Sequence, residues 1–194
     1  MRRVYYKIAV VASIVVLIFS ACEGPQGPMG NADVSTGTMT LVDGDWQSGY
    51  YDFETPNQSL ISRPASTYSM SVSQLTESIL DSGMVLVYYR VVNRSLSDTN
   101  TYEPLPVKFT SPFNTEYTHN IRYKYDVGTI ELYYYYSDND ASDSNNPPDI
   151  SNDTLPDIQI KWVVASSSAA SSMITAGVDL NDYHEVQKAI ISTQ

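Results

Sequence analysis

The sequence has a single cysteine, Cys22, among its 194 residues. One thiol cannot build an internal disulfide framework, and it leaves no second cysteine for a thiolate metal site. The fold must therefore be held together by an apolar core. A chain of this length can bury such a core as one domain.

Recognisable catalytic motifs are missing as well. The sequence contains no GxSxG, HExxH, P-loop or GxGxxG pattern. No motif therefore supports the interpretation of the chain as a hydrolase, a metalloprotease or a nucleotide-binding protein. Its two histidines, His119 and His184, have no nucleophile or metal-ligand partner at a familiar spacing. We therefore interpret both as structural residues and predict a protein that is not an enzyme and needs no cofactor.

Basic residues are few, with 11 Lys and Arg against 22 Asp and Glu. Three of the 11, Arg2, Arg3 and Lys7, lie in the first seven residues, so eight remain if the N-terminal segment is removed. A strongly acidic chain is repelled by the phosphate backbone. We predict no nucleic-acid partner.

Long hydrophobic runs are absent, except for one near the N-terminus. The uncharged stretch from Ile8 to Ala21 follows three basic residues and ends in small ones, which is typical of an export signal. At 14 residues it is shorter than the roughly 20 that a membrane-spanning helix needs. We predict that residues 1–21 are a signal peptide.

The last three residues of the signal and the residue that follows it, Phe19-Ser20-Ala21-Cys22, resemble the lipobox of bacterial lipoproteins, although leucine is more usual than Phe19. The resemblance implies cleavage before Cys22 and attachment of lipid to its thiol, so that the membrane is a partner through this lipid. Several acyl chains on one residue give durable anchoring. Three glycine-led triplets then begin at Gly24, too few for a lasting collagen helix, and residues 22–33 are expected to form an extended spacer.

Period-two alternation dominates the rest of the chain. It is clearest in Glu116–Val127, in the run from Ile130 to Tyr136 and in the run from Ile158 to Val164, with a hairpin turn at Asp126–Gly128. Further strands are expected over Gly37–Val42, Gly49–Glu54, Tyr68–Val72, Met84–Val92 and Leu105–Thr110. The pattern predicts an all-β fold over residues 34–194, a single antiparallel β-sandwich, Ig-like or related, of about seven to eight strands.

Two short helices are expected to accompany the strands. Ser73 can cap a helix over Gln74–Leu80, and a C-terminal helix over about 182–191 has capping-box spacing between Asp182 and Glu185. The apolar stripe of the second helix should dock on the sandwich. The Ser- and Ala-rich stretch Ser166–Ser172 is expected to be a link.

The acidic segment 138–156 is predicted to be a long exposed loop. Asp138, Asp140 and Asp143 are spaced like the first residues of an EF-hand calcium loop. The match does not continue, because aspartate stands where such a loop needs glycine at position six and glutamate at position twelve. Weak Ca²⁺ binding and a solvated acidic loop are both open.

Aromatic residues suggest a binding surface. The chain has 16 tyrosines and only four phenylalanines, and strand alternation places Tyr133 and Tyr135 opposite the core side. Together with Tyr89 they are expected to form an exposed ladder for a sugar ring or another protein. The alternative is that tyrosine is simply a good strand residue.

A broader resemblance covers most of the chain after residue 21. It is carried by Cys22–Pro28, Asp45–Trp46, Ile79–Arg90, Tyr102–Pro106 and Gly128–Tyr134, which are similar to a group of small exported lipoproteins of Bacteroidota with a short collagen-like stub. The resemblance implies a location in the cell envelope, at the outer membrane, and leaves open which face of that membrane carries the protein. The group has no assigned activity that could be transferred to this chain. The resemblance also implies that Thr154, within Asp153-Thr154-Leu155, is an O-glycosylation acceptor.

Taken together, these patterns predict a lipid-anchored binding or structural module that recognises an envelope protein or a glycan. Two alternatives stay open. One is an envelope hydrolase that uses a pair of carboxylates, which a sequence cannot locate. The other is a calcium-stabilised adhesion module.

Overall fold

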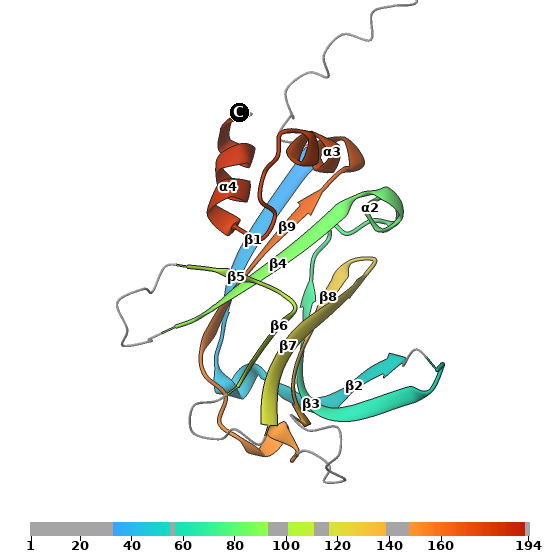
Figure 1. Ribbon diagram of the computed structural model, residues 1–194, viewed down its shortest axis with the longest axis vertical. Helices are drawn as coiled ribbons and strands as arrows, with labels where there is room; N and C mark the ends of the chain where they lie inside the picture. The colour runs from blue at the N-terminus through green and yellow to red at the C-terminus, as the bar shows by residue number, and fades with distance from the viewer. Residues whose placement is uncertain (1–32, 55–56, 93–100, 111–116, 139–147, 193–194) are drawn as a thin grey trace, which may run out of the picture.

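The computed structural model describes residues 33–54, 57–92, 101–110, 117–138 and 148–192 (Figure 1). Cys22, the signal peptide and almost all of the spacer lie outside these residues. So do Asp140 and Asp143 of the calcium prediction.

The described residues form an all-β sandwich of two antiparallel sheets, as predicted. The four-stranded sheet has the order β1 (Val34–Leu41), β9 (Ile158–Ala165), β4 (Met84–Val91) and β5 (Glu103–Pro104). The five-stranded sheet has the order β2 (Gln47–Glu54), β3 (Leu60–Ser71), β8 (Thr129–Asp138), β7 (Tyr117–Asp126) and β6 (Val107–Thr110). The described residues thus contain nine strands. The predicted strand Leu105–Thr110 is found in shorter form as β6, which pairs with β7. Just before it, Glu103–Pro104 forms the unpredicted strand β5, which pairs with β4 in the other sheet.

The core fills the space between the sheets, and strand alternation determines which residues enter it. On β8, Ile130, Leu132 and Tyr134 face inward and are at most 2% exposed. On β9, Ile158 and Ile160 meet them from the opposite sheet. The predicted β7–β8 hairpin is confirmed, and its turn contains Gly128 at φ 75°, a conformation that favours glycine.

The internal helix α2 (Glu77–Ser82) begins later than predicted. Leu75, expected inside it, instead lies in a turn before it, where its N–H donates to the Val72 carbonyl and its carbonyl accepts from Gly128 N–H. Thr76, not Ser73, occupies the N-cap position. The side chain of Leu75 is 1% exposed, so burial in the core fixes this turn outside the helix.

The predicted link Ser166–Ser172 is wrong, because helix α3 (Ser167–Thr175) occupies it. Ser166 caps this helix by accepting a hydrogen bond from Ala169 N–H at 3.3 Å. Ala169 and Ala170 are buried, and their small side chains let the helix approach the sheet closely. The serines that looked like a linker are the cap and the solvent side of a helix.

The C-terminal helix α4 (Tyr183–Ser192) confirms the predicted range and docking. Tyr183 and Val186 are buried against the sandwich. Asp182 accepts from His184 N–H at 2.8 Å, whereas Glu185 accepts from Asp179 N–H rather than completing the predicted capping box. Among the described residues, no helix is long and apolar enough to cross a membrane.

Helices α3 and α4 lie at one end of the molecule, over the outer face of the four-stranded sheet (Figure 1). They enclose a second apolar cluster, built around Tyr88, Val163 and Met173, all of which are 0% exposed. The chain enters β1 at this same end, since Ser166 N–H donates to the Asp33 carbonyl. The helices cover only part of the outer face of this sheet.

The acidic segment is only partly an exposed loop. Residues 139–147 lie outside the described part, but the following stretch contains a 3₁₀ turn, η3 (Ile150–Asn152). Ile150 is 0% and Leu155 5% exposed, so this half of the predicted loop packs on the sandwich. The acidic composition of the segment gave no indication that Ile150 and Leu155 would be buried.

Candidate functional site

The predicted tyrosine ladder is not exposed. Tyr133 and Tyr135 do lie on the outer face of the five-stranded sheet, but they are only 8% and 5% exposed. Tyr51 from β2 stacks on Tyr135, with ring centroids 4.8 Å apart, and meets Tyr133 edge-on at 5.1 Å. Ala65 of β3 lies between these strands, and its small side chain lets the rings close over it. We call Tyr51, Ala65, Tyr133 and Tyr135 the outer tyrosine cluster.

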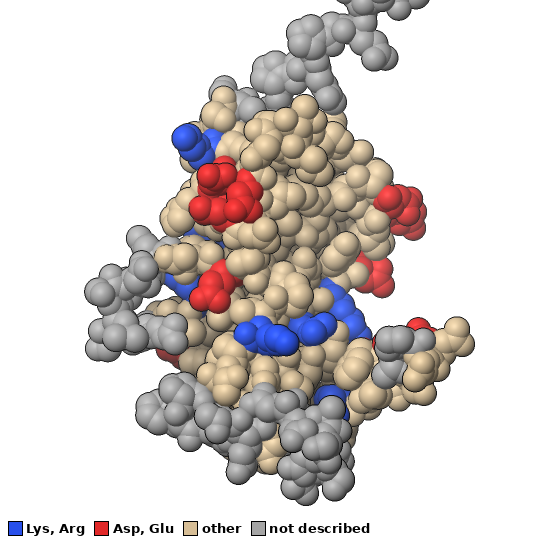
Figure 2. All heavy atoms as spheres, in the orientation of Figure 1, with Lys and Arg blue, Asp and Glu red and all other residues tan. Residues whose placement is uncertain are grey.

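Basic side chains complete this cluster. Lys124 Nζ lies 4.8 Å from the ring centre of Tyr51 and 5.4 Å from that of Tyr133, and it donates to the Asp52 carbonyl at 2.6 Å. Figure 2 shows basic side chains gathered low on the visible face, with acidic side chains mostly around and above them. Burial, followed by a hydrogen bond to Glu131, raises the pKa of Tyr133 well above its usual value. The cluster is a closed, packed unit rather than an open platform.

Tyr89 does not join the other two tyrosines. It belongs to β4 in the opposite sheet, faces the core and is 6% exposed. Its hydroxyl donates to Glu103 Oε2 at 3.4 Å. The predicted association of Tyr89 with Tyr133 and Tyr135 is therefore wrong, because the sequence did not reveal which strands share a sheet.

His119 occupies a structural position. Its ring stacks on Phe109 at 5.0 Å, and its Nδ1 lies 2.9 Å from the hydroxyl of Tyr134. Burial lowers the pKa of His119, and the opposing effect of the Asp153 carboxylate is smaller.

This environment predicts a pH-dependent stability. Unfolding releases His119 to its ordinary pKa of about 6.5, so the unfolded state binds more protons below that pH. We expect stability to fall as the pH drops from about 6.5 toward the lowered pKa of the folded state. Urea unfolding at a series of pH values should show this slope in the wild type. His119→Phe should flatten it, and an unchanged slope would contradict the assignment.

The described residues provide no metal site, since no three His, Cys, Asp or Glu side chains among them come together. The calcium prediction falls on Asp140 and Asp143, outside those residues, and on Asp138, the last residue of β8. It stays a prediction. Thr154 is exposed, just beyond η3.

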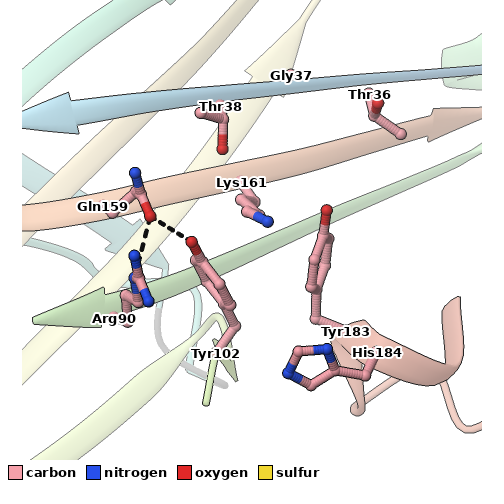
Figure 3. Close-up of a pocket in the computed structure, with 9 residues that line it drawn as sticks. All are labelled: Thr36, Gly37, Thr38, Arg90, Tyr102, Gln159, Lys161, Tyr183 and His184. Carbon is pink, nitrogen blue, oxygen red and sulfur yellow. Dashed lines mark hydrogen bonds between the residues drawn. The ribbon is translucent and has the colours of Figure 1, made fainter. Parts of the chain in front are cut away.

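A cavity of about 590 Å³ opens on the uncovered outer face of the four-stranded sheet, beside the first turn of α4 (Figure 3). Its lining comes from five segments that are far apart in the sequence: β1, β4, the residue before β5, β9 and the first turn of α4. The lining residues are Thr36, Gly37, Thr38, Arg90, Tyr102, Gln159, Lys161, Tyr183 and His184. A cavity of this size is within the range of small-molecule binding sites.

Two cations are held in fixed positions within this cavity. Lys161 Nζ lies 4.5 Å from the ring centre of Tyr102 and 4.2 Å from that of Tyr183, so the ammonium lies between two aromatic walls. The Arg90 guanidinium lies 4.9 Å from the Tyr102 ring centre, and Arg90 Nε donates to Gln159 Oε1 at 3.0 Å. The Tyr102 hydroxyl donates to the same Gln159 oxygen (Figure 3). Aromatic faces and one amide therefore orient both positive groups.

On the opposite side the lining offers hydroxyl groups. Thr36 and Thr38 are exposed on the edge strand β1, on the same face as Lys161. Beneath them Gly37 is required by close approach, because a Cβ there would lie 1.9 Å from the Trp162 ring. The cavity thus combines neutral hydroxyls with two cations, and no described lining residue is acidic.

This site was not predictable from the sequence. Alternation in β9 does place Gln159 and Lys161 opposite the core-facing Ile158 and Ile160. However, β1, β4 and β9 become neighbours only through sheet order, and Tyr183 arrives from α4. The one available signal was the presence of Lys161 in an acidic chain.

A second, smaller cavity of about 290 Å³ lies along β2, β3 and β8. Its described lining includes Tyr50, Tyr68 and Tyr133 but only one carboxylate, Glu131. A glycoside hydrolase of the usual kind needs two carboxyl groups on either side of the scissile bond. The described lining residues of the two cavities do not include such a pair, so they add no support to the hydrolase alternative.

In comparisons with protein-family models, curated proteins and solved structures, nothing matched this chain.

Proposed function

We propose that this protein is a lipid-anchored, non-enzymatic binding module of the bacterial cell envelope, and that it binds a glycan in the cavity between β1, β9, β4 and α4. The cavity carries this proposal: its volume of about 590 Å³ suits a small saccharide, and its lining is rich in hydroxyl groups. The outer tyrosine cluster, which suggested the same function from sequence, is too buried to serve as the platform.

The anchor follows from the sequence of the first 33 residues. A lipid attached to Cys22 after removal of residues 1–21, followed by a glycine-rich spacer, would hold the sandwich close to a membrane. The described chain begins at the end of the sandwich that carries α3 and α4, which would then face the anchor (Figure 1). The cavity opens on the side of the sandwich, where an extended ligand can reach it.

The anchor can be tested by metabolic labelling with a palmitate analogue. We expect the wild type to be labelled and to sediment with membranes, and Cys22→Ser to lose both properties because the acylated thiol is gone. Equal labelling of the variant would contradict lipid attachment at Cys22.

Glycan binding can be tested by blocking the cavity without changing the core. Thr36 is an exposed lining residue on the edge strand β1, so Thr36→Trp should fill the opening at little cost in stability. Ser48→Trp is the matched control, at an exposed position on β2, the edge strand of the other sheet.

The measurement is binding of the full-length protein, in detergent micelles, to an array of neutral and acidic oligosaccharides. We expect the wild type and Ser48→Trp to bind the same saccharides and Thr36→Trp to lose them. The proposal is wrong if no saccharide binds, or if Thr36→Trp binds as well as the wild type.

A further inference from the structure

We infer that the glycan bound in this cavity is acidic, with an anionic group placed against Lys161 and Arg90. This inference rests on the proposed function and specifies its ligand class. It depends on the charge of the lining, which the proposal of glycan binding did not use.

Positive charge is concentrated in this cavity. Beyond residue 21 the chain has only eight basic residues against 22 acidic ones. Two of those eight, Arg90 and Lys161, line this one cavity, and none of its described lining residues is acidic. A cavity with two cations in an acidic molecule attracts anions locally and selects against neutral ligands.

The two cations are also preorganised. Lys161 Nζ is placed between the rings of Tyr102 and Tyr183, which are each 7% exposed and therefore fixed by packing. Gln159 accepts hydrogen bonds from both Arg90 and Tyr102, which fixes the orientation of the guanidinium. Charged donors that are already in position lose little conformational entropy when a ligand binds.

Two carboxylates at the start of α4 accept hydrogen bonds from backbone N–H groups. Asp182 accepts from His184 N–H, and Glu185 accepts from Asp179 N–H. They are outside the cavity lining. The rings beside Lys161 stabilise its charge through their faces but do not neutralise it. A ligand carboxylate or sulfate would add a negative charge beside the Lys161 ammonium.

The surrounding groups fit a sugar that carries such an anion. Thr36 and Thr38 can exchange hydrogen bonds with ring hydroxyls, while the anionic group approaches Lys161 between the tyrosine walls. The carboxylate of a uronic acid and the sulfate of a sulfated sugar share this chemistry, and the experiment below distinguishes them.

The test uses the full-length protein in detergent micelles with three probes: trigalacturonic acid, its neutral methyl ester and a sulfated galactan oligosaccharide. We expect an anionic probe to bind at least about tenfold more tightly than the methyl ester. Its affinity should also fall as salt rises from about 50 mM to about 500 mM, because the Debye length shortens.

Variants separate the cavity from general charge. Lys161→Met should weaken binding of the anionic probe by about tenfold or more, and Lys161→Arg should restore most of it. Lys188→Met is the matched control, since Lys188 is exposed on α4 and outside the lining, and we expect it to bind as the wild type does. If Lys161→Met lowers the melting temperature, Arg90→Gln provides the second test of the same charge.

The outcomes are distinct. Stronger binding of trigalacturonic acid assigns the anion as a carboxylate, and stronger binding of the sulfated probe assigns it as a sulfate. If neither trigalacturonic acid nor the sulfated probe binds more tightly than the methyl ester, the inference is overturned but glycan binding is left intact. Absence of any saccharide binding would overturn both, and an unchanged affinity in Lys161→Met would overturn the assignment to this cavity.

Discussion

Replacing Tyr88 by alanine should lower the free energy of unfolding by about 3–5 kcal/mol. Tyr88 is 0% exposed and lies between β4 and the helical layer, where its ring meets Tyr183 of α4 edge-on at 5.2 Å. Its hydroxyl donates to the Leu180 carbonyl at 2.7 Å, in the connection that leads into α4. Alanine would leave a cavity under α4 and remove both contacts.

Two comparisons separate the ring from its hydroxyl. Tyr88→Phe keeps the packing and loses only the hydrogen bond, so we expect a cost of about 1 kcal/mol. Tyr50→Ala removes a ring that is 64% exposed, and its cost should stay within about 0.5 kcal/mol. Urea unfolding followed by circular dichroism measures all three, and a Tyr88→Ala cost no larger than that of Tyr50→Ala would contradict this role.

This position also matters for binding. Tyr183 and His184 line the cavity from the first turn of α4, so loosening that helix would disturb the site without changing its charge. Variants that test the ligand class must therefore leave the Tyr88 contacts intact. Thr36→Trp changes a residue on the edge strand β1. Lys161, by contrast, pairs with Tyr88 across β9 and β4 and contacts the Tyr183 ring, so the melting temperature of Lys161→Met has to be compared with that of the wild type.

The fold was predictable because each strand carries its own pattern. Alternation of Ile130, Leu132 and Tyr134 on β8 reflects one buried face, and Gly128 marks the turn that begins it. The docking of α4 was also predictable, because the apolar residues Tyr183 and Val186 are at helical spacing. These are local properties, and a local periodicity can be recognised in a single sequence.

The site was not predictable because it depends on contacts between elements. Tyr133 and Tyr135 were correctly assigned to the outer face, but their burial depends on Tyr51, which is about 80 residues away and reaches them across Ala65. The cavity similarly needs Lys161, Arg90 and Tyr183 from three elements. Helix α3 was missed for a local reason, since serine is common both in linkers and at helix caps.

The burial of the outer tyrosine cluster reverses the effect expected of its mutations. Exposed rings could be removed with loss of binding and little loss of stability, whereas buried rings are part of the folded structure. Tyr135→Ala should therefore cost about 3 kcal/mol, because Tyr135 is 5% exposed and stacked on Tyr51. The glycan binding that we propose for the cavity, on the other sheet, should be unchanged in the folded variant.

A double-mutant cycle tests the stacking itself. Tyr51→Ala and Tyr135→Ala should each destabilise the protein, and the double variant should be more stable than the sum of their costs predicts, by about 1 kcal/mol. A parallel cycle of Tyr135→Ala with Tyr125→Ala, a ring that is 45% exposed on β7, should be additive within about 0.5 kcal/mol. Urea unfolding of the six proteins gives both coupling energies. A coupling near zero between Tyr51 and Tyr135, together with a small cost for Tyr135→Ala, would mean that the rings do not close over Ala65, and the exposed binding ladder expected from alternation would again be the better description of this face.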